Sequence, residues 1–541
     1  MIRVMYIINE SEPGGAAQSL LDMLAVNSGK IDPSVIIPAA GRIEEWLQQF
    51  HITYYIVPFE TDHRKIGEHS SREDEFIFQS NYRAALELQE IVGQLGIQII
   101  HTNSSVCNVG AFLALMTGLP HIWHIRELME EHYGCEFVDN ALKRKLFGCA
   151  DKIISISRCV SKIYKDKYGV DCTCIYDGLH IERFIETESF EKEADSFLMA
   201  GHITPAKGQM DAIKAARELA GQGIEAHLYI VGPAESDYYR WFLHRCIRQY
   251  GLEQNIRILA YRKDLRELRR RCRYSITGSR MEALGRVTVE AMLAGCVVIG
   301  ADTGGTAEII GWDGSRGYLY RQGNYQDLAR VMRYAVEHAD NNRSIQRAAQ
   351  DYAISNFDAE KYIEKITELY EDALREKERP TAARNKELLE KLQERYEKVK
   401  DMEEGTGIES LACQNNEKNQ MLAEMIRQWF AIKLEKKSLV TVLLKRDIGS
   451  VAIYGMGYLG RSLYQELEDS SVEITYVMDR ALEDREGVLR IIRPDEAFPK
   501  VDAVIVTVLG DVRALCESIR NKCGYPVITL KNLLDWCEEE Q

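Results

Sequence analysis

The sequence of 541 residues contains no apolar run that approaches the roughly 20 residues needed by a membrane-spanning helix. Its first apolar stretch, RVMYIIN at residues 3–9, is too short for a signal peptide and is typical of a β-strand. The 13 cysteines form no paired C-x-x-C motif, so neither a zinc site nor a disulfide framework is indicated. These absences predict a cytoplasmic protein with reduced thiols, whose only contact with a membrane would be peripheral.

Basic residues are outnumbered by acidic ones. The 68 lysines and arginines stand against 83 aspartates and glutamates, which gives a net charge of −15. A chain with this charge is not expected to bind nucleic acid. One basic stretch, residues 143–167, allows two interpretations: a solvated helix face, or a face that docks on an anionic membrane.

Short apolar strands alternate with helices in two long segments and again near the C-terminus. This pattern predicts an α/β fold with two facing doubly wound, Rossmann-like domains, in which ligands bind between the carboxyl ends of the strands. Polar residues 60–78 are expected to form a long loop, either mobile or facing the cleft. The predicted parts are a first domain (1–178), a linker (179–195), a second domain with its last helices (196–377), a solvated helical linker (378–446) and a small Rossmann-like module (447–541).

Residues 274–308 contain two carboxylates eight positions apart. Glu282 is expected on a loop at the carboxyl end of a strand, and Glu290 inside the helix that follows. Gly285 lies between them, where it lets backbone approach a ligand, and the helix start beyond it suits an anion. Ligand hydroxyls are one partner for these carboxylates. The structural alternative is that Glu282 caps or solvates its loop and that Glu290 pairs with a nearby arginine or lysine.

Two further segments have the features of phosphate-binding turns. Gly14 and Gly15 follow the first strand and precede a helix, whose N-terminal N–H groups can bind phosphate, although a plain tight turn has the same sequence. Lys207 lies in the segment GHITPAKG at residues 201–208, directly after a strand. It is either a phosphate-binding cation or a surface lysine.

The spacing E-x7-E, followed by AM-x-AG-x-VVI and a GG-x-x-E turn, resembles the donor-site signature of retaining GT-B glycosyltransferases of glycosyltransferase family 4. The resemblance covers about residues 1–375. It implies transfer of a hexosyl group, with retention, from a nucleotide-diphosphate sugar to a glycan or lipid-linked glycan in bacterial surface polysaccharide synthesis. No metal or other cofactor is required for such transfer.

The resemblance also assigns roles to residues. It implies that Glu282 holds the sugar hydroxyls and Glu290 the ribose. The group that it places at the donor diphosphate consists of Lys207 and the backbone near Gly14, Gly15 and Gly285.

This chain departs from the family pattern at one cation. The family segment G-R-x-x-x-x-K-G has an arginine where this chain has His202, and histidine lacks the permanent charge and the two-pronged donor geometry of arginine. Arg286 is a candidate substitute. His124, at a strand end in HIWHIREL, matches a family histidine that contacts the sugar or acceptor, while a structural histidine is the other interpretation.

Near the C-terminus, Gly455, Gly457 and Gly460 form a G-x-G-x-x-G motif between a strand and a helix, and Asp479 closes the next strand. This context is typical of dinucleotide binding. The module resembles small Rossmann modules attached to sugar-handling enzymes. We predict a binding or regulatory module for NAD(P) or a nucleotide, with an empty structural module as the alternative.

The sequence therefore predicts a glycosyltransferase. Two other functions stay open: a non-catalytic GT-B partner of another transferase, which His202 suggests, and a fusion with an NAD(P)-dependent sugar-modifying module.

Overall fold

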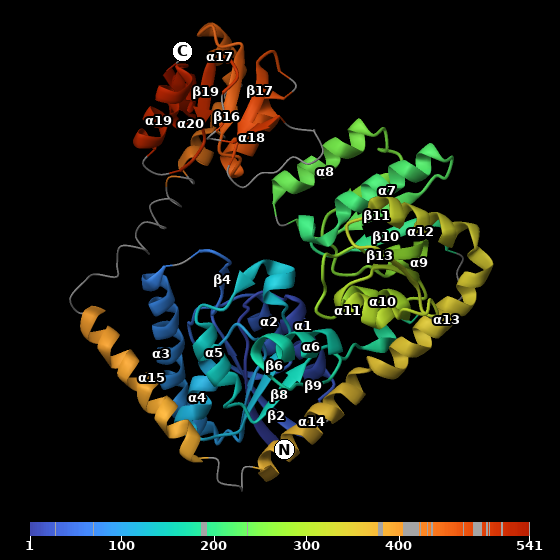
Figure 1. Cartoon of the computed structure of the whole chain (residues 1–541), viewed down its shortest axis with the longest axis vertical. Coiled ribbons are helices and arrows are strands. Elements are labelled where there is room, and N and C mark those ends of the chain that lie inside the picture. The colour runs from blue at the N-terminus through green and yellow to red at the C-terminus, as the bar shows by residue number, and fades with distance from the viewer. Residues whose placement is uncertain are drawn as a thin grey trace. The chain divides into compact units, whose positions relative to one another are not determined.

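The computed structural model describes the chain except for residues 28, 69, 186–191, 235, 377–381, 404–420, 422–423, 430, 434–436, 469, 480–489, 494–495, 497, 510–511 and 540–541. It forms two compact units, Met1–Asp401 and Met402–Gln541. The first unit contains two α/β domains with helices around each sheet, and the second contains one (Figure 1). The predicted fold class is confirmed.

The first domain is built on a seven-stranded parallel sheet in the order β3-β2-β1-β5-β6-β8-β9. Its strands are β1 (Ile2–Ile7), β2 (Ile31–Ile37), β3 (Thr53–Ile56), β5 (Ile99–Thr102), β6 (His121–Ile125), β8 (Lys152–Ser155) and β9 (Thr173–Cys174). Its helices are α1 (Gly15–Ala25), α2 (Arg42–Gln49), α3 (Ser71–Leu95), α4 (Val109–Thr117), α5 (Asn140–Phe147) and α6 (Arg158–Tyr168). The domain also contains a π-helical turn, η1 (Met129–Tyr133), and a short antiparallel pair formed by β4 (Arg64–Lys65) and β7 (Cys135–Glu136).

The second domain has six parallel strands in the order β12-β11-β10-β13-β14-β15. They are β10 (Glu193–Ala200), β11 (His227–Val231), β12 (Ile256–Leu259), β13 (Cys272–Thr277), β14 (Val297–Ala301) and β15 (Tyr318–Tyr320). The helices are α7 (Gln209–Gly221), α8 (Asp237–Gln249), α9 (Arg266–Arg271), α10 (Arg286–Leu293), α11 (Gly304–Ile310), α12 (Tyr325–Glu337) and α13 (Ala339–Asn356), with 3₁₀ turns η2 (Ile181–Arg183) and η3 (Pro205–Lys207). In both sheets the strand order reverses beside the first strand, which is where open α/β sheets bind ligands.

Helix α14 (Ala359–Glu376) returns from the second domain to the first. Its apolar face, including Ile363, Ile366 and Tyr370, is buried in the same core as β1 and α1. The spacing of three and four residues places these side chains on one side of the helix. The first domain therefore takes part of its core from a segment that follows the second domain.

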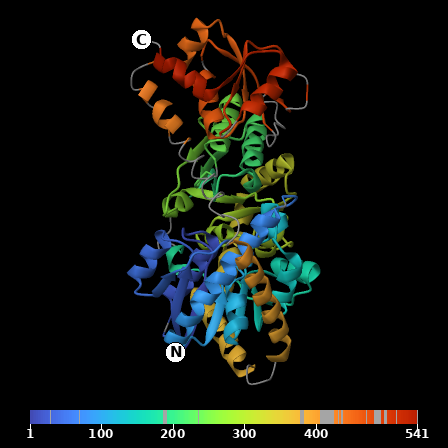
Figure 2. The same cartoon turned by 90° about the vertical axis from the view of Figure 1, so that its left-hand side faces the viewer.

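Helix α15 (Ala382–Glu403) corrects the prediction of a solvated linker. It lies beside α3 in both views (Figures 1 and 2), and its Leu392 is 3% exposed in the first-domain core. The Tyr396 ring lies 4.7 Å from the Tyr82 ring, and Arg395 Nη2 lies 2.9 Å from Glu75 Oε2. The helix is thus part of the first unit.

The predicted loop at residues 60–78 is also wrong over its second half, because α3 begins at Ser71. The Ser70 hydroxyl accepts a hydrogen bond from the backbone N–H of Glu73 and so caps this helix.

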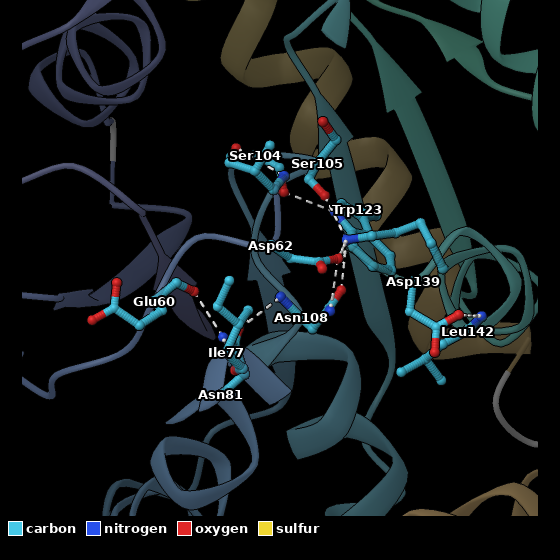
Figure 3. Close-up of polar contacts among 12 residues, drawn as sticks. Glu60, Asp62, Ile77, Asn81, Ser104, Ser105, Asn108, Trp123, Asp139 and Leu142 are labelled. Atoms are coloured by element: carbon cyan, nitrogen blue, oxygen red, sulfur yellow. Dashed lines mark hydrogen bonds and ion pairs between the residues drawn. The ribbon is translucent and has the colours of Figure 1, made fainter. Parts of the chain in front are cut away.

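Lys143, the first residue of the basic stretch, is buried rather than solvated. Its Nζ lies 2.7 Å from Asp62 Oδ2, 2.6 Å from Asn108 Oδ1 and 2.8 Å from the Ser105 carbonyl oxygen, and Figure 3 shows these partners. Lys167, at the other end of the stretch, forms ion pairs with glutamates of η1. Much of the predicted basic face is therefore neutralised within the first domain.

The second unit has a parallel sheet in the order β18-β17-β16-β19-β20. Its elements are α17 (Leu439–Lys445), β16 (Ser450–Tyr454), α18 (Tyr458–Leu467), β17 (Glu473–Met478), β18 (Ile491–Ile492), β19 (Ala503–Val506), α19 (Arg513–Cys523), β20 (Val527–Thr529) and α20 (Leu530–Glu539). A preceding helical segment packs on it through Trp429, whose Nε1 donates to Glu466 Oε2 at 2.8 Å. No helix in the described part of the chain could span a membrane.

Candidate active site

Three loops at the carboxyl edge of the second sheet are tied together by backbone hydrogen bonds. The Arg280 N–H donates to the Ala206 carbonyl oxygen (2.7 Å), and the Gly305 N–H donates to the Glu282 carbonyl oxygen (2.8 Å). Gly304 has φ of 58°, and a Cβ there would lie 2.5 Å from the same Glu282 oxygen. The glycine pair after β14 is therefore needed to hold the Glu282 loop in place.

These loops bring Glu282 and Lys207 into contact, although 75 residues separate them in the sequence. Lys207 Nζ and the Ser279 hydroxyl each lie 2.6 Å from Glu282 Oε1. Burial opposes ionisation of Glu282, but the charge of Lys207 and the hydrogen bonds from Lys207 and Ser279 outweigh it and hold the pKa of this carboxyl below its ordinary value. Glu282 is therefore a carboxylate at neutral pH, able to accept hydrogen bonds from hydroxyl groups.

His132 was not identified from the sequence. It lies in the π-helical turn η1 of the first domain and stacks on Tyr133, with ring centroids 4.3 Å apart. Burial, reinforced by the charge of Lys207, lowers the pKa of His132 to about 4, while Glu282 acts in the opposite direction. Turns of this type are frequent at functional sites, but nothing in the local sequence marks one here.

This environment gives a titration prediction. The His132 ring should stay neutral down to a pKa of about 4, and Lys207→Met should raise that pKa, because the lysine charge is lost and the Glu282 charge remains. NMR titration of ¹³C-labelled histidine, assigned with a His132→Gln variant, measures both values. His244 is the control, because its pKa is lowered by its own burial and by Arg240 and Arg248, and Lys207→Met should not change it. An unchanged His132 pKa in Lys207→Met would contradict the placement of these groups.

In the unfolded chain the His132 ring has a pKa of about 6.5. The difference from its pKa in the folded state determines how the stability of the protein changes with pH. The folded state binds fewer protons than the unfolded state between these two values. The contribution of His132 to the free energy of unfolding is therefore full above about pH 6.5 and falls as the pH drops towards 4.

Glu290 of α10 is engaged with Arg269 of α9, and both side chains are mostly buried. This is the ion pair expected under the structural interpretation. The predicted contact of Glu290 with a ribose stays a prediction, and it would require the carboxylate to share or exchange this arginine.

The start of α1 differs from the predicted phosphate site. The Glu10 carboxylate accepts hydrogen bonds from the N–H groups of Gly14 (3.2 Å) and Ala17 (3.3 Å). A Cβ on Gly14 would lie 2.6 Å from Glu10 Oε2, so Gly14 makes room for this side chain. Burial and the nearby Glu127 raise the pKa of Glu10. An anion at this helix start would have to displace a carboxylate of the chain itself.

His124 and His202 lie in opposite environments. His124 is fully buried, with Nδ1 3.3 Å from Arg126 Nη2, and burial lowers its pKa well below the ordinary value. Arg126 in turn forms an ion pair of 2.6 Å with Asp177 and contacts Tyr362 of α14. His202 is exposed, and its carbonyl oxygen accepts from Gln209 Nε2 at 2.8 Å. Their predicted roles at the sugar and diphosphate stay predictions.

Residues of the two domains of the first unit are in direct contact. Arg286 Nη2, at the start of α10, lies 2.6 Å from Asp22 Oδ2 of α1. The Ser157 hydroxyl donates to the Ala283 carbonyl oxygen at 2.5 Å. Glu308, from the GG-x-x-E turn, caps α6 by accepting from the N–H groups of its first two residues at 3.0 and 2.9 Å. These contacts were not predicted, because they join residues more than 120 positions apart.

In the second unit, the glycine motif is shaped by its own backbone. Gly455 has φ of 93°, and a Cβ on Gly460 would lie 1.9 Å from the Gly455 carbonyl oxygen. Asp479 Oδ2 accepts from the Met456 N–H at 2.7 Å. The carboxylate predicted to bind ribose therefore also holds the glycine turn, and binding of a nucleotide stays a prediction.

Family models match most of the two-domain region. Residues 181–352 match the model described as Glycosyl transferases group 1, and residues 55–183 match Glycosyltransferase Family 4. An uncharacterized glycosyltransferase of Methanocaldococcus jannaschii, MJ1178, is 23% identical over 298 residues, which cover 52% of this chain and 78% of that protein. Residues 55–352 therefore belong to the glycosyltransferases of group 1 and family 4.

Solved structures with the same fold include Alr3699/HepE of Anabaena, with a TM-score of 0.58 and 22% identity over 69% of this chain and 100% of that one. A glycosyltransferase from Rickettsia africae gives 0.57 and 19%, covering 69% and 98% of the two chains. TarM gives 0.55 and 12%, covering 68% and 99%. The likeness to these three structures is one of fold.

Proposed function

We propose that the first unit transfers a hexosyl group, with retention, from a nucleotide-diphosphate sugar to a glycan or lipid-linked glycan in surface polysaccharide synthesis. The observation that carries this proposal is the Lys207–Glu282 pair at the carboxyl edge of the donor-side sheet, in a chain that matches glycosyltransferase models on both sides of the cleft. Structures of Alr3699/HepE in complex with UDP and with UDP-glucose support a nucleotide-sugar donor.

In this proposal the bond between the sugar C1 and the diphosphate oxygen breaks, and its electron pair leaves with the nucleoside diphosphate. A bond forms between C1 and the acceptor oxygen on the same face, and the acceptor proton passes to the leaving diphosphate. Lys207 stabilises the charge that develops on the diphosphate, because a fixed cation in a cleft needs little reorganisation. Glu282 accepts hydrogen bonds from sugar hydroxyls and so orients C1.

The test begins with thermal-shift measurements of the full chain against a panel of nucleotide sugars and nucleotides. A donor at 100 times its Kd should stabilise the folded chain by about 2.7 kcal/mol. Mass spectrometry then follows transfer to glycan acceptors, and NMR gives the anomeric configuration of the product. Inversion at C1 would exclude retention and leave transfer intact.

Absence of turnover with every donor, together with binding to another transferase, would instead favour the non-catalytic partner function. The fusion with an NAD(P)-dependent module is tested separately by titrating the full chain with NAD(H) and NADP(H). No binding by calorimetry would exclude that function without affecting the transferase proposal.

A further inference from the structure

Asp22 lies at the centre of a small polar group between the two domains of the first unit. It is 6% exposed, and its Oδ2 lies 2.6 Å from Arg286 Nη2. Gln18 Nε2 donates to Oδ1 at 2.9 Å, and Arg183 Nη1 lies 3.4 Å from the same oxygen. The two arginines differ in their surroundings, since the side chain of Arg286 is 15% exposed and that of Arg183 is 55% exposed.

The Arg286 guanidinium has an N–H donor group that no described residue uses. Nη2 is used by Asp22, whereas Nη1 is buried and has no hydrogen-bond partner among the described residues. An unsatisfied buried donor is costly, and such groups in native structures call for an explanation such as a ligand or a catalytic role. Burial opposes the charge of Arg286, but Asp22, Asp177 and Glu290 together raise its pKa, so it stays a cation.

The position of Arg286 suits the donor diphosphate. It is the first residue of α10, directly after Gly285, and it shares its short loop with Glu282. The exposed His202, at the place where an arginine was expected, lacks the two-pronged donor geometry of arginine. A guanidinium can bind a carboxylate with one N–H pair and a phosphate oxygen with another, which a lysine or histidine cannot do in the same geometry.

We propose that Asp22 is a positioning residue that aims Arg286 Nη1 at the donor diphosphate, so that Arg286 supplies the cation missing at His202. This inference rests on the proposed function. Because Asp22 belongs to α1 of the first domain and Arg286 to α10 of the second, the cation is in place only when the two domains are together.

The test compares variants around one carboxylate. Arg286→Gln should lower kcat by about 100-fold, as expected for loss of a preorganised charge in the transition state. Asp22→Asn should lower kcat about 10-fold with little change in the KM of the acceptor. Arg183→Gln removes the other arginine on Asp22 and is the matched control, with kcat within about twofold of the wild type.

The double variant Asp22→Asn/Arg286→Gln separates positioning from a general structural role. If Asp22 acts through Arg286, the double variant is no slower than Arg286→Gln alone, since the two residues act as a unit. Free guanidinium should restore part of the activity of Arg286→Ala. Multiplying effects in the double variant, or a loss in Arg183→Gln equal to that in Asp22→Asn, would overturn the proposal.

A binding measurement distinguishes this inference from the proposed function. Calorimetry with UDP should show about 10-fold weaker binding for Arg286→Gln and Asp22→Asn, and unchanged binding for Arg183→Gln, whether or not the wild type transfers sugar. UDP binding that is equal in all variants overturns the inference even if transfer is confirmed. If the wild type binds no nucleoside diphosphate, both ideas are wrong.

Discussion

Replacing Glu282 with glutamine is expected to reduce kcat for sugar transfer by at least about 100-fold. The neutral amide has an N–H₂ donor in place of one acceptor oxygen, accepts more weakly from sugar hydroxyls, and no longer balances the Lys207 charge. The overall fold should be retained, since Gln is close in volume and the Glu282 loop is held by backbone hydrogen bonds. Steady-state kinetics with the donor found in the thermal-shift screen measures the loss, and circular dichroism checks the fold.

Glu193→Gln is a suitable control for this experiment. Glu193 is a carboxylate of the same domain that pairs with Arg271, but it lies at the amino end of β10, opposite the cleft. Its replacement should leave kcat within about twofold of the wild type, as expected for an exposed pair. Wild-type turnover in Glu282→Gln would show that this loop is not the donor site.

Lys143→Met is expected to destabilise the first unit by about 3–5 kcal/mol, because it leaves the buried Asp62 carboxylate without its charge partner. Burial lowers the pKa of Lys143, and Asp62 opposes this effect, so the pair depends on mutual neutralisation. The Lys143 ammonium also lies 5.0 Å from the centre of the Trp123 ring. Urea unfolding followed by tryptophan fluorescence, to which Trp123 contributes as one of six tryptophans, measures the loss of stability.

Two further variants test whether the loss of stability comes from the unpaired Asp62 charge. The double change Lys143→Met/Asp62→Asn removes both charges and should recover part of the lost stability, since no charge is then left unpaired. Lys165→Met breaks an exposed pair with Asp171 and should cost at most about 1 kcal/mol. A Lys143→Met protein as stable as the Lys165→Met control would mean that the interior pair contributes nothing to the fold.

The sequence was sufficient for the fold class and for the neighbourhood of Glu282 and Lys207. Strand ends can be located from apolar periodicity, and residues that follow neighbouring strands of a parallel sheet must meet at one edge. The contact between Glu282 and Lys207 follows from that rule, because β10 and β13 are neighbours in the sheet.

The sequence was not sufficient for contacts that depend on how the two domains meet. Asp22 and His132 reach the second domain from α1 and η1, and no local pattern reveals which helix face will point across a cleft. The contact of Glu10 with Gly14 could not be predicted either. The Glu10 carboxylate accepts a hydrogen bond from the Gly14 N–H only because of the shape of the turn between these two residues.

For two of the wrong predictions, the loop at residues 60–78 and the solvated linker, the sequence does contain a pattern that indicates the observed structure. Ser70 followed by Glu73 is the start of a capping box, and it marks the beginning of α3 within the segment predicted as a loop. Leu388, Leu392 and Tyr396 are four residues apart within the charged stretch, which places a narrow apolar stripe on α15. The large number of charges around that stripe hid it.

The return of α14 to the first domain affects the order in which the protein can be made. Tyr362, Ile366 and Tyr370 complete the core around β1, so this core lacks a wall until the ribosome has synthesised the whole second domain. At ordinary elongation rates, the roughly 200 residues between Cys174 and Ala373 take about 10–40 s. During that time the nascent first domain has an open apolar face, and a fragment ending near residue 178 would lack the same part of its core.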